Sequence, residues 1–71
     1  MNIITDKSLF IKQANSLITN EKNLITNLSN LSALYKEYLP NTNWVGFYIA
    51  DKEQNNLVLG PFQGKVACTR I

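Results

Sequence analysis

Cys68 is the residue of this chain best suited to chemistry, because a thiolate can attack electrophilic sulfur or exchange with a disulfide. It is the only cysteine. Lys65 and Arg70 lie close to it in the sequence, and a neighbouring cation favours the thiolate form of a cysteine. The alternative interpretation is that Cys68 is a small buried hydrophobic residue in a strand. The residues by themselves leave both interpretations open.

Two aromatic residues form a second candidate for function. Trp44 and Tyr48 are four positions apart, so in a strand both would project from one face with Gly46 between them. In one interpretation the gap beside Gly46 admits a ligand. In the other, the two rings pack against helices and glycine makes room for them. Gln63 is a further candidate, for contact with a polar group of a ligand.

Composition narrows the classes of function. The 71 residues allow one small domain, and the single cysteine excludes an internal disulfide. The chain has no histidine, which leaves few options for a metal site. We expect no metal site and no cofactor. A net charge of +2 without a basic cluster does not suggest nucleic-acid binding. No apolar run approaches the roughly 20 residues that span a bilayer. One thiol and no secretory leader predict a reducing, cytoplasmic setting.

Helical spacing of apolar residues predicts two helices before position 40. Asp6 is a suitable N-cap for the first helix, which Thr19-Asn20 interrupts. Asn20 is a plausible cap for the second helix, opened by Glu21, and Pro40 ends it. Tyr35 and Tyr38 lie on the apolar stripe of this second helix, which predicts core packing or a contact between two copies, and not catalysis.

After position 43 the hydrophobic period changes from 3.6 to 2. Residues 44–50 alternate and are rich in aromatic and β-branched types, which predicts a strand. A polar connection leads to a second strand that begins at Leu57-Val58-Leu59 and forms a hairpin with the first. Gly60-Pro61 should end or bend the second strand. Residues 66–71 predict either a further short strand or the continuation of a bent one.

These elements predict an α+β architecture of two helices followed by the first strands of an antiparallel sheet. A two-stranded hairpin is marginally stable in water, and the far edge of the second strand would expose unpaired backbone groups. The elements therefore have the character of the first half of a larger domain.

Three motifs in this order resemble the amino-terminal part of the free methionine-(R)-sulfoxide reductases, which are single-domain enzymes of GAF fold. They are Asn43-Trp44-x-Gly46-Phe47-Tyr48, Leu57-Val58-Leu59-Gly60-Pro61-Phe62-Gln63-Gly64 and Ala67-Cys68-x-Arg70-Ile71. The resemblance extends over roughly residues 8–71. It implies that residues 1–71 are the amino-terminal part of one GAF domain, truncated before the remaining strands and the segment with the catalytic cysteine.

The resemblance also implies roles for individual residues. In this family a thiolate attacks the sulfoxide sulfur, a second cysteine forms a disulfide with the resulting sulfenic acid, and thioredoxin reduces that disulfide. Cys68 matches the first family cysteine, which resembles a resolving partner and not the nucleophile. Trp44 and Tyr48 are implied to line the pocket for the substrate's methyl-sulfoxide group, and GAF domains commonly pair as homodimers through such helices.

With one thiol, the 71-residue chain by itself is expected to be inactive towards free methionine sulfoxide. Two alternatives remain: a non-enzymatic GAF module that binds a small molecule or dimerises, and a chain that is ordered only when its strands pair with a second copy.

Overall fold

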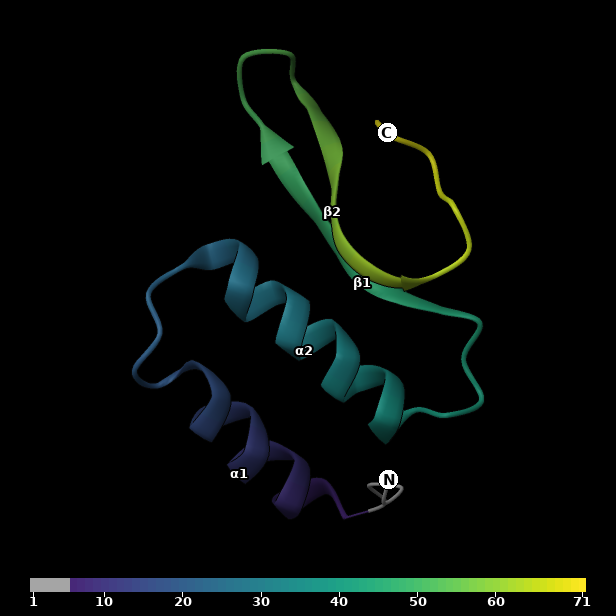
Figure 1. Cartoon of the computed structure of the whole chain (residues 1–71). Coiled ribbons are helices and arrows are strands. Elements are labelled where there is room, and N and C mark those ends of the chain that lie inside the picture. Colours follow the sequence, from purple (N-terminus) through teal and green to yellow (C-terminus); the bar gives the residue numbers. More distant parts are fainter. Residues whose placement is uncertain (1–5) are drawn as a thin grey trace.

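A computed structural model describes residues 6–71 as two helices followed by a hairpin. The elements are α1 (Lys7–Ile18), α2 (Leu24–Tyr38), β1 (Trp44–Asp51) and β2 (Asn56–Gly64). Figure 1 shows α1 beside α2, the hairpin above α2, and the last residues curving back beside β2. Helix α2 contacts α1 and both strands, so it is the middle layer of the molecule. This arrangement confirms the predicted order of helices and antiparallel strands.

The first helix begins where the sequence predicts. Asp6 is its N-cap, and the Asp6 carboxylate Oδ1 accepts hydrogen bonds of 2.9 Å from both the backbone N–H and the hydroxyl of Ser8. These bonds satisfy a backbone donor that the helix cannot pair internally. The helix ends at Ile18 with Thr19 as its C-cap.

The second helix begins later than the sequence suggested. Its N-cap is Asn23, whose side-chain oxygen accepts a 2.9 Å hydrogen bond from the Thr26 N–H. The prediction of Asn20 as the cap, with Glu21 opening the helix, is therefore wrong. Glu21 lies in the connection, where its carboxylate accepts from the Asn23 N–H at 3.0 Å and so orients the true cap. The predicted end is confirmed, since α2 stops at Tyr38, two residues before Pro40.

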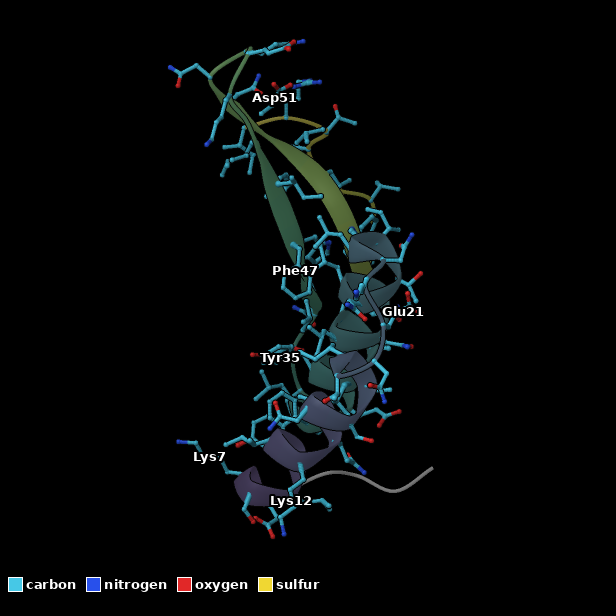
Figure 2. The ribbon with its side chains drawn as sticks, turned by 90° about the vertical axis from the view of Figure 1, so that its left-hand side faces the viewer. Lys7, Lys12, Glu21, Tyr35, Phe47 and Asp51 are labelled. Atoms are coloured by element: carbon cyan, nitrogen blue, oxygen red, sulfur yellow. The ribbon has the colours of Figure 1, made fainter. Side chains whose placement is uncertain are left out.

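The best-buried apolar contact lies between the two helices. Phe10 and Leu34 are the buried hydrophobic residues of the described chain. The Phe10 ring lies 4.9 Å from the Tyr35 ring and 4.5 Å from the Tyr38 ring, measured between centroids. Figure 2 shows Tyr35 in this region, below the hairpin. The prediction that the two tyrosines serve packing is confirmed, because both contact the ring of the neighbouring helix.

The hairpin pairs antiparallel from Trp44 opposite Gly64 to Asp51 opposite Asn56. The register shifts by one residue between Gly46 and Tyr48, so Gly60 and Pro61 together oppose Phe47. Such a bulge accommodates a proline, which has no N–H to donate to the ladder. Of the two predicted outcomes at Gly60-Pro61, the strand does not end there; it continues to Gly64.

The turn of the hairpin is held by its own side chains. Asp51 Oδ1 accepts hydrogen bonds from the backbone N–H groups of Glu53 at 3.1 Å and Gln54 at 3.3 Å. Asn55 has a positive φ of 55°, a conformation that asparagine tolerates better than most residues.

Only the last three residues pair with the sheet, whereas residues 66–71 had been expected to form a strand. The Leu57 N–H donates to the Ile71 carbonyl, the Ile71 N–H donates to the Leu57 carbonyl, and the Leu59 N–H donates to the Thr69 carbonyl, each at 2.9 Å. Residues 65–68 form an irregular loop before this pairing. The far edge of β2 is therefore partly covered, and the expectation that it is open is corrected for Leu57–Leu59.

No helix within residues 6–71 combines the length and the hydropathy needed to cross a membrane.

Candidate functional site

One face of the hairpin carries a stack of three aromatic rings, which we call the aromatic face: Trp44, Tyr48 and Phe62. The Trp44 ring lies 6.1 Å from the Tyr48 ring and 5.5 Å from the Phe62 ring, with interplanar angles of 30° and 17°. The first pair follows from the two-residue period of β1. Phe62 joins them because the shifted register places it opposite Gly46.

Gly46 makes room for this stack. A Cβ atom at position 46 would lie 2.7 Å from Trp44 Cη2 and 2.9 Å from Phe62 Cα, both closer than real Cβ contacts. The space beside Gly46 is thus occupied by aromatic side chains. Gly46 therefore gives Trp44 and Phe62 room to pack together, and the role of Trp44 and Tyr48 in ligand binding stays a prediction.

The loop of residues 65–68 returns along the aromatic face. The Tyr48 hydroxyl donates a 2.6 Å hydrogen bond to the backbone carbonyl of Cys68. At the other end of the loop, Lys65 and Val66 line a hollow of about 340 Å³ together with Asn43 and Trp44. Trp44 and Tyr48 of β1 are therefore both adjacent to the segment that carries the thiol.

The indole N–H of Trp44 is buried and has no hydrogen-bond partner within the described residues. An unpaired buried donor is unfavourable in a finished fold. A hydrogen-bond acceptor supplied by a ligand or by further protein would therefore stabilise this position.

Cys68 is exposed and belongs to no regular element. The interpretation of Cys68 as a buried strand residue is therefore wrong. Arg70, expected near the thiol, has its guanidinium engaged elsewhere: Nη1 donates to Asp51 Oδ2 and to Asn56 Oδ1, each at 2.9 Å. Lys65 is exposed at the start of the loop.

The Arg70 guanidinium beside Asp51 is the main reason that the pKa of this carboxyl lies below its ordinary value. The hydrogen bond from the Gln54 N–H acts in the same direction. The negative charge of Asp51 is thus stabilised at the point where the hairpin turn meets the last residues of the chain.

Gln63 lies apart from the other candidates. It pairs with Val45, whereas its neighbour Phe62 pairs with Gly46 on the aromatic face. Successive residues of a strand point to opposite faces, so the register puts Gln63 on the face of Val45. The structure therefore brings Trp44, Tyr48 and Cys68 together and does not bring Gln63 to them.

Sequence reasoning missed Phe62 as a member of the aromatic face. Its place depends on the one-residue bulge, because a regular register would put a different residue opposite Gly46. Proline at position 61 is the signal that could have suggested the bulge.

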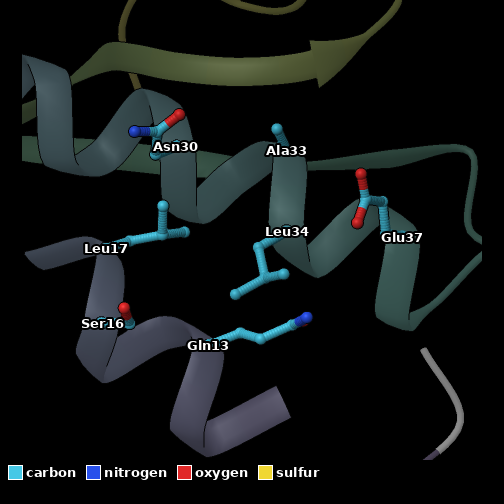
Figure 3. Close-up of a pocket in the computed structure, with 7 residues that line it drawn as sticks. All are labelled: Gln13, Ser16, Leu17, Asn30, Ala33, Leu34 and Glu37. Carbon is cyan, nitrogen blue, oxygen red and sulfur yellow. The ribbon is translucent and has the colours of Figure 1, made fainter. Parts of the chain in front are cut away.

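A second hollow, of about 370 Å³, lies between the helices (Figure 3). Its lining comes from α1 and α2 alone: Gln13, Ser16, Leu17, Asn30, Ala33, Leu34 and Glu37. It contains no cysteine, and no residue of the hairpin or of the Cys68 loop lines it. Within residues 6–71, no three residues of the types His, Cys, Asp and Glu gather as metal ligands would.

No family model matches the sequence. The chain is 51% identical over 57 residues to the free methionine-R-sulfoxide reductase of Escherichia coli (strain K12), covering 80% of this chain and 33% of that protein. It superposes on the substrate complex of the Staphylococcus aureus protein named fRMsr with a TM-score of 0.87 and 49% identity, covering 100% of this chain and 46% of the other. A putative GAF sensor protein of Burkholderia vietnamiensis matches with a TM-score of 0.83 and 48% identity, over 90% of this chain and 39% of that one. The chain thus spans less than half the length of these relatives.

Proposed function

We propose that this chain, which is similar to free methionine-R-sulfoxide reductases, is an amino-terminal portion of such a GAF-fold enzyme and supplies part of a site that reduces free methionine (R)-sulfoxide. The contact from the Tyr48 hydroxyl to the Cys68 carbonyl carries this proposal, since it joins the aromatic face to the thiol segment. In the proposed site Trp44 and Tyr48 bind the methyl-sulfoxide group, because aromatic rings interact favourably with polarisable sulfur. Gln63 has the weakest support as a binding residue.

In the proposed reaction Cys68 is the resolving thiol, and a cysteine outside this chain is the nucleophile. The nucleophilic thiolate attacks the sulfoxide sulfur, and the oxygen passes to the cysteine sulfur with uptake of one proton as its bond to the substrate sulfur breaks. Methionine leaves, and the cysteine is oxidised to a sulfenic acid. The Cys68 thiolate then attacks the sulfenic sulfur and forms a disulfide, and the hydroxide that leaves takes up a proton from solvent to become water. A dithiol such as thioredoxin reduces this disulfide by exchange and is itself oxidised to a disulfide. The exposure of Cys68 suits both of the last two steps.

This scheme needs two protein thiols, and the 71 residues contain one. We therefore propose that the 71-residue polypeptide alone does not turn over, and that residues 1–71 are the amino-terminal part of one GAF domain. A reducing, cytoplasmic compartment and a thioredoxin partner belong to the same proposal, because the cycle consumes dithiol.

A second candidate function is a GAF module that binds a small molecule without reacting. The similarity to a putative GAF sensor protein favours it, and it requires the aromatic face but no redox role for Cys68. The two functions therefore make different predictions for a Cys68→Ser variant.

A chimera tests the proposed function. The matched segment of the Staphylococcus aureus relative is replaced by this chain, which covers 46% of that protein. Release of methionine from each sulfoxide epimer is then measured with thioredoxin and, separately, with dithiothreitol. The matched variants are Cys68→Ser and Trp44→Ala, and the 71-residue chain alone is the inactive reference.

The expected result is release from the R epimer by the chimera, lost in Cys68→Ser with thioredoxin but retained with dithiothreitol. The small dithiol can reduce the sulfenic acid directly, so it does not need a resolving cysteine. A folded chimera that binds the sulfoxide without releasing methionine would favour the sensor function. If Cys68→Ser released methionine equally well with thioredoxin and with dithiothreitol, Cys68 would not be the resolving thiol.

A further inference from the structure

The guanidinium of Arg70 connects three segments that are separate in the sequence. Its Nη1 donates to Asp51 at the end of β1 and to Asn56 at the start of β2, each at 2.9 Å. Arg70 itself lies in the final segment, opposite Val58 of β2. We call this group of three side chains the Arg70 clasp. It ties both ends of the hairpin turn to the last residues of the chain.

The side chains of the clasp are partly shielded from solvent. The exposed fractions are 41% for the Arg70 side chain and 24% for that of Asp51. Asp51 is already oriented, because its other carboxylate oxygen accepts two backbone hydrogen bonds within the turn. Arg70 therefore binds a carboxylate whose orientation is already fixed. Less conformational entropy is lost on forming this pair than on pairing two mobile surface side chains.

The clasp holds in place the residues on either side of Arg70, Thr69 and Ile71. With the guanidinium held at the turn, the backbone of Thr69 and Ile71 pairs with Leu59 and Leu57. Cys68 directly precedes this paired segment, and its carbonyl is held from the other side by the Tyr48 hydroxyl. The thiol residue is thus fixed between the clasp and the aromatic face.

We infer that Arg70, through Asp51 and Asn56, is a positioning residue that holds Cys68 against the aromatic face. The functional meaning of this positioning rests on the proposed function, because a resolving thiol must stay close to the cysteine with which it forms a disulfide. Its geometry does not depend on that function. The test below therefore uses neither sulfoxide nor turnover, so it fails or succeeds independently of the proposed reaction.

Amide hydrogen exchange of the 71-residue chain measures whether the Arg70 clasp stabilises the pairing of residues 69–71 with β2. The variants are Arg70→Ala, Arg70→Lys, and Lys65→Ala as a matched control that removes an exposed cation outside the clasp. We expect exchange at Leu57, Leu59 and Ile71 to rise about 1.5- to fivefold in Arg70→Ala, the range for a solvent-accessible ion pair. Exchange in α2 should not change, and Lys65→Ala should match the parent.

The position of Cys68 is measured by attaching a nitroxide label to its thiol and recording which nuclear magnetic resonance signals the label broadens. In the parent the label should broaden the indole N–H signal of Trp44 and the amide signals of β1. In Arg70→Ala this broadening should weaken and spread over other residues, while Arg70→Lys, which keeps the charge, should restore part of it. A variant destabilised as a whole would instead raise exchange in α2 as well, and Arg70→Lys then provides the comparison in a folded chain.

Exchange and broadening in Arg70→Ala equal to those of the parent would overturn the inference. So would faster exchange in Lys65→Ala equal to that in Arg70→Ala, because the effect would then come from net charge and not from the clasp.

Discussion

At the residue scale, the candidate site depends on a few side chains that occupy space which other residues leave free. Gly46 has no Cβ, and the Trp44 ring together with Cα and Cβ of Phe62 lies against the position that a Cβ would take. The Tyr48 hydroxyl then reaches the carbonyl of Cys68. The aromatic face and the thiol segment are therefore coupled through close packing, which makes the site sensitive to single methyl groups.

The substitution Gly46→Ala tests this packing. The added methyl group would meet Trp44 Cη2 at 2.7 Å, so the rings must shift, and overpacking of this kind costs about 1–3 kcal/mol in the free energy of unfolding. Urea denaturation followed by Trp44 fluorescence measures both the loss and the ring displacement.

Gly60→Ala is the matched control for Gly46→Ala. A Cβ at position 60 would lie 3.0 Å from the Phe47 backbone carbonyl oxygen and 3.2 Å from Ile49 Cδ1, both farther than the contacts at position 46. We expect a smaller loss there. Equal stability of Gly46→Ala and the parent would show that the aromatic stack is looser than described.

At the element scale, capping groups decide where α2 begins and how the hairpin turn closes. The Asn23 side chain caps α2, although Asn20 has the same chemistry three positions earlier. Asp51 accepts two backbone hydrogen bonds in the turn with one carboxylate oxygen and contacts Arg70 with the other. The start of α2 and the hairpin turn are thus each closed by a side chain whose backbone partners lie two to three residues away, and Arg70 adds a distant contact at the turn.

Asn23→Ala should lower the free energy of unfolding by about 1 kcal/mol, the usual cost of losing an N-cap. Asn20→Ala provides a matched control and should stay within about 0.5 kcal/mol of the parent, since no cap is lost. Thermal denaturation followed by circular dichroism compares the two variants. If Asn20→Ala were the less stable variant, Asn20 and not Asn23 would be the N-cap of α2.

The turn should respond to acid through Asp51. Its folded pKa is lowered, first by Arg70 and then by the Gln54 N–H, so its contribution to stability is complete above the ordinary value near 4. That contribution is lost as the pH falls through the folded value. We expect hydrogen-exchange protection at Leu57 and Ile71 to decrease below about pH 4.

The variant Asp51→Asn isolates this effect, because it keeps an acceptor oxygen but cannot titrate. Its protection at Leu57 and Ile71 should be lower than in the parent at neutral pH and should vary less with acid. Asp6, whose pKa is also lowered, chiefly by the Ser8 hydroxyl, acts instead on the start of α1. If protection at Leu57 and Ile71 in Asp51→Asn fell with acid as it does in the parent, a group other than Asp51 would be responsible.

At the scale of the whole molecule, the described chain has little buried apolar surface. Its buried hydrophobic residues are Phe10 and Leu34, while Leu24, Ile25 and Val66 are 58%, 54% and 96% exposed. Within residues 6–71, β1 pairs with β2 alone, so its second edge has no partner strand. A domain of this size with so small a core is marginal by itself.

We therefore expect the melting temperature of the isolated chain to rise with protein concentration, because association through an exposed edge or apolar surface stabilises the folded state. Calorimetry over about a hundredfold range of concentration, with sedimentation to measure mass, checks this. A constant melting temperature together with a monomeric mass would contradict it.

The sequence by itself determined the order and type of the elements, because hydrophobic period and capping chemistry are local properties. The change of period at position 44, Asp6 as a cap and Pro40 as a stop all read correctly. The order of the motifs also indicated the resemblance to free methionine-(R)-sulfoxide reductases, and the chain is similar to solved fRMsr structures. The start of α2 was predicted wrongly at Asn20, because Asn23 has the same capping chemistry and the structure uses Asn23.

Only the tertiary structure decided how residues distant in the sequence meet. The bulge opposite Phe47 places Phe62 on the aromatic face and Gln63 on the other, and a shift of one residue would exchange them. The pairing of Arg70 with Asp51 and Asn56, and of Tyr48 with Cys68, spans 14 to 20 positions. Such contacts follow from strand register and from the path of the loop over the sheet, and no local propensity specifies either.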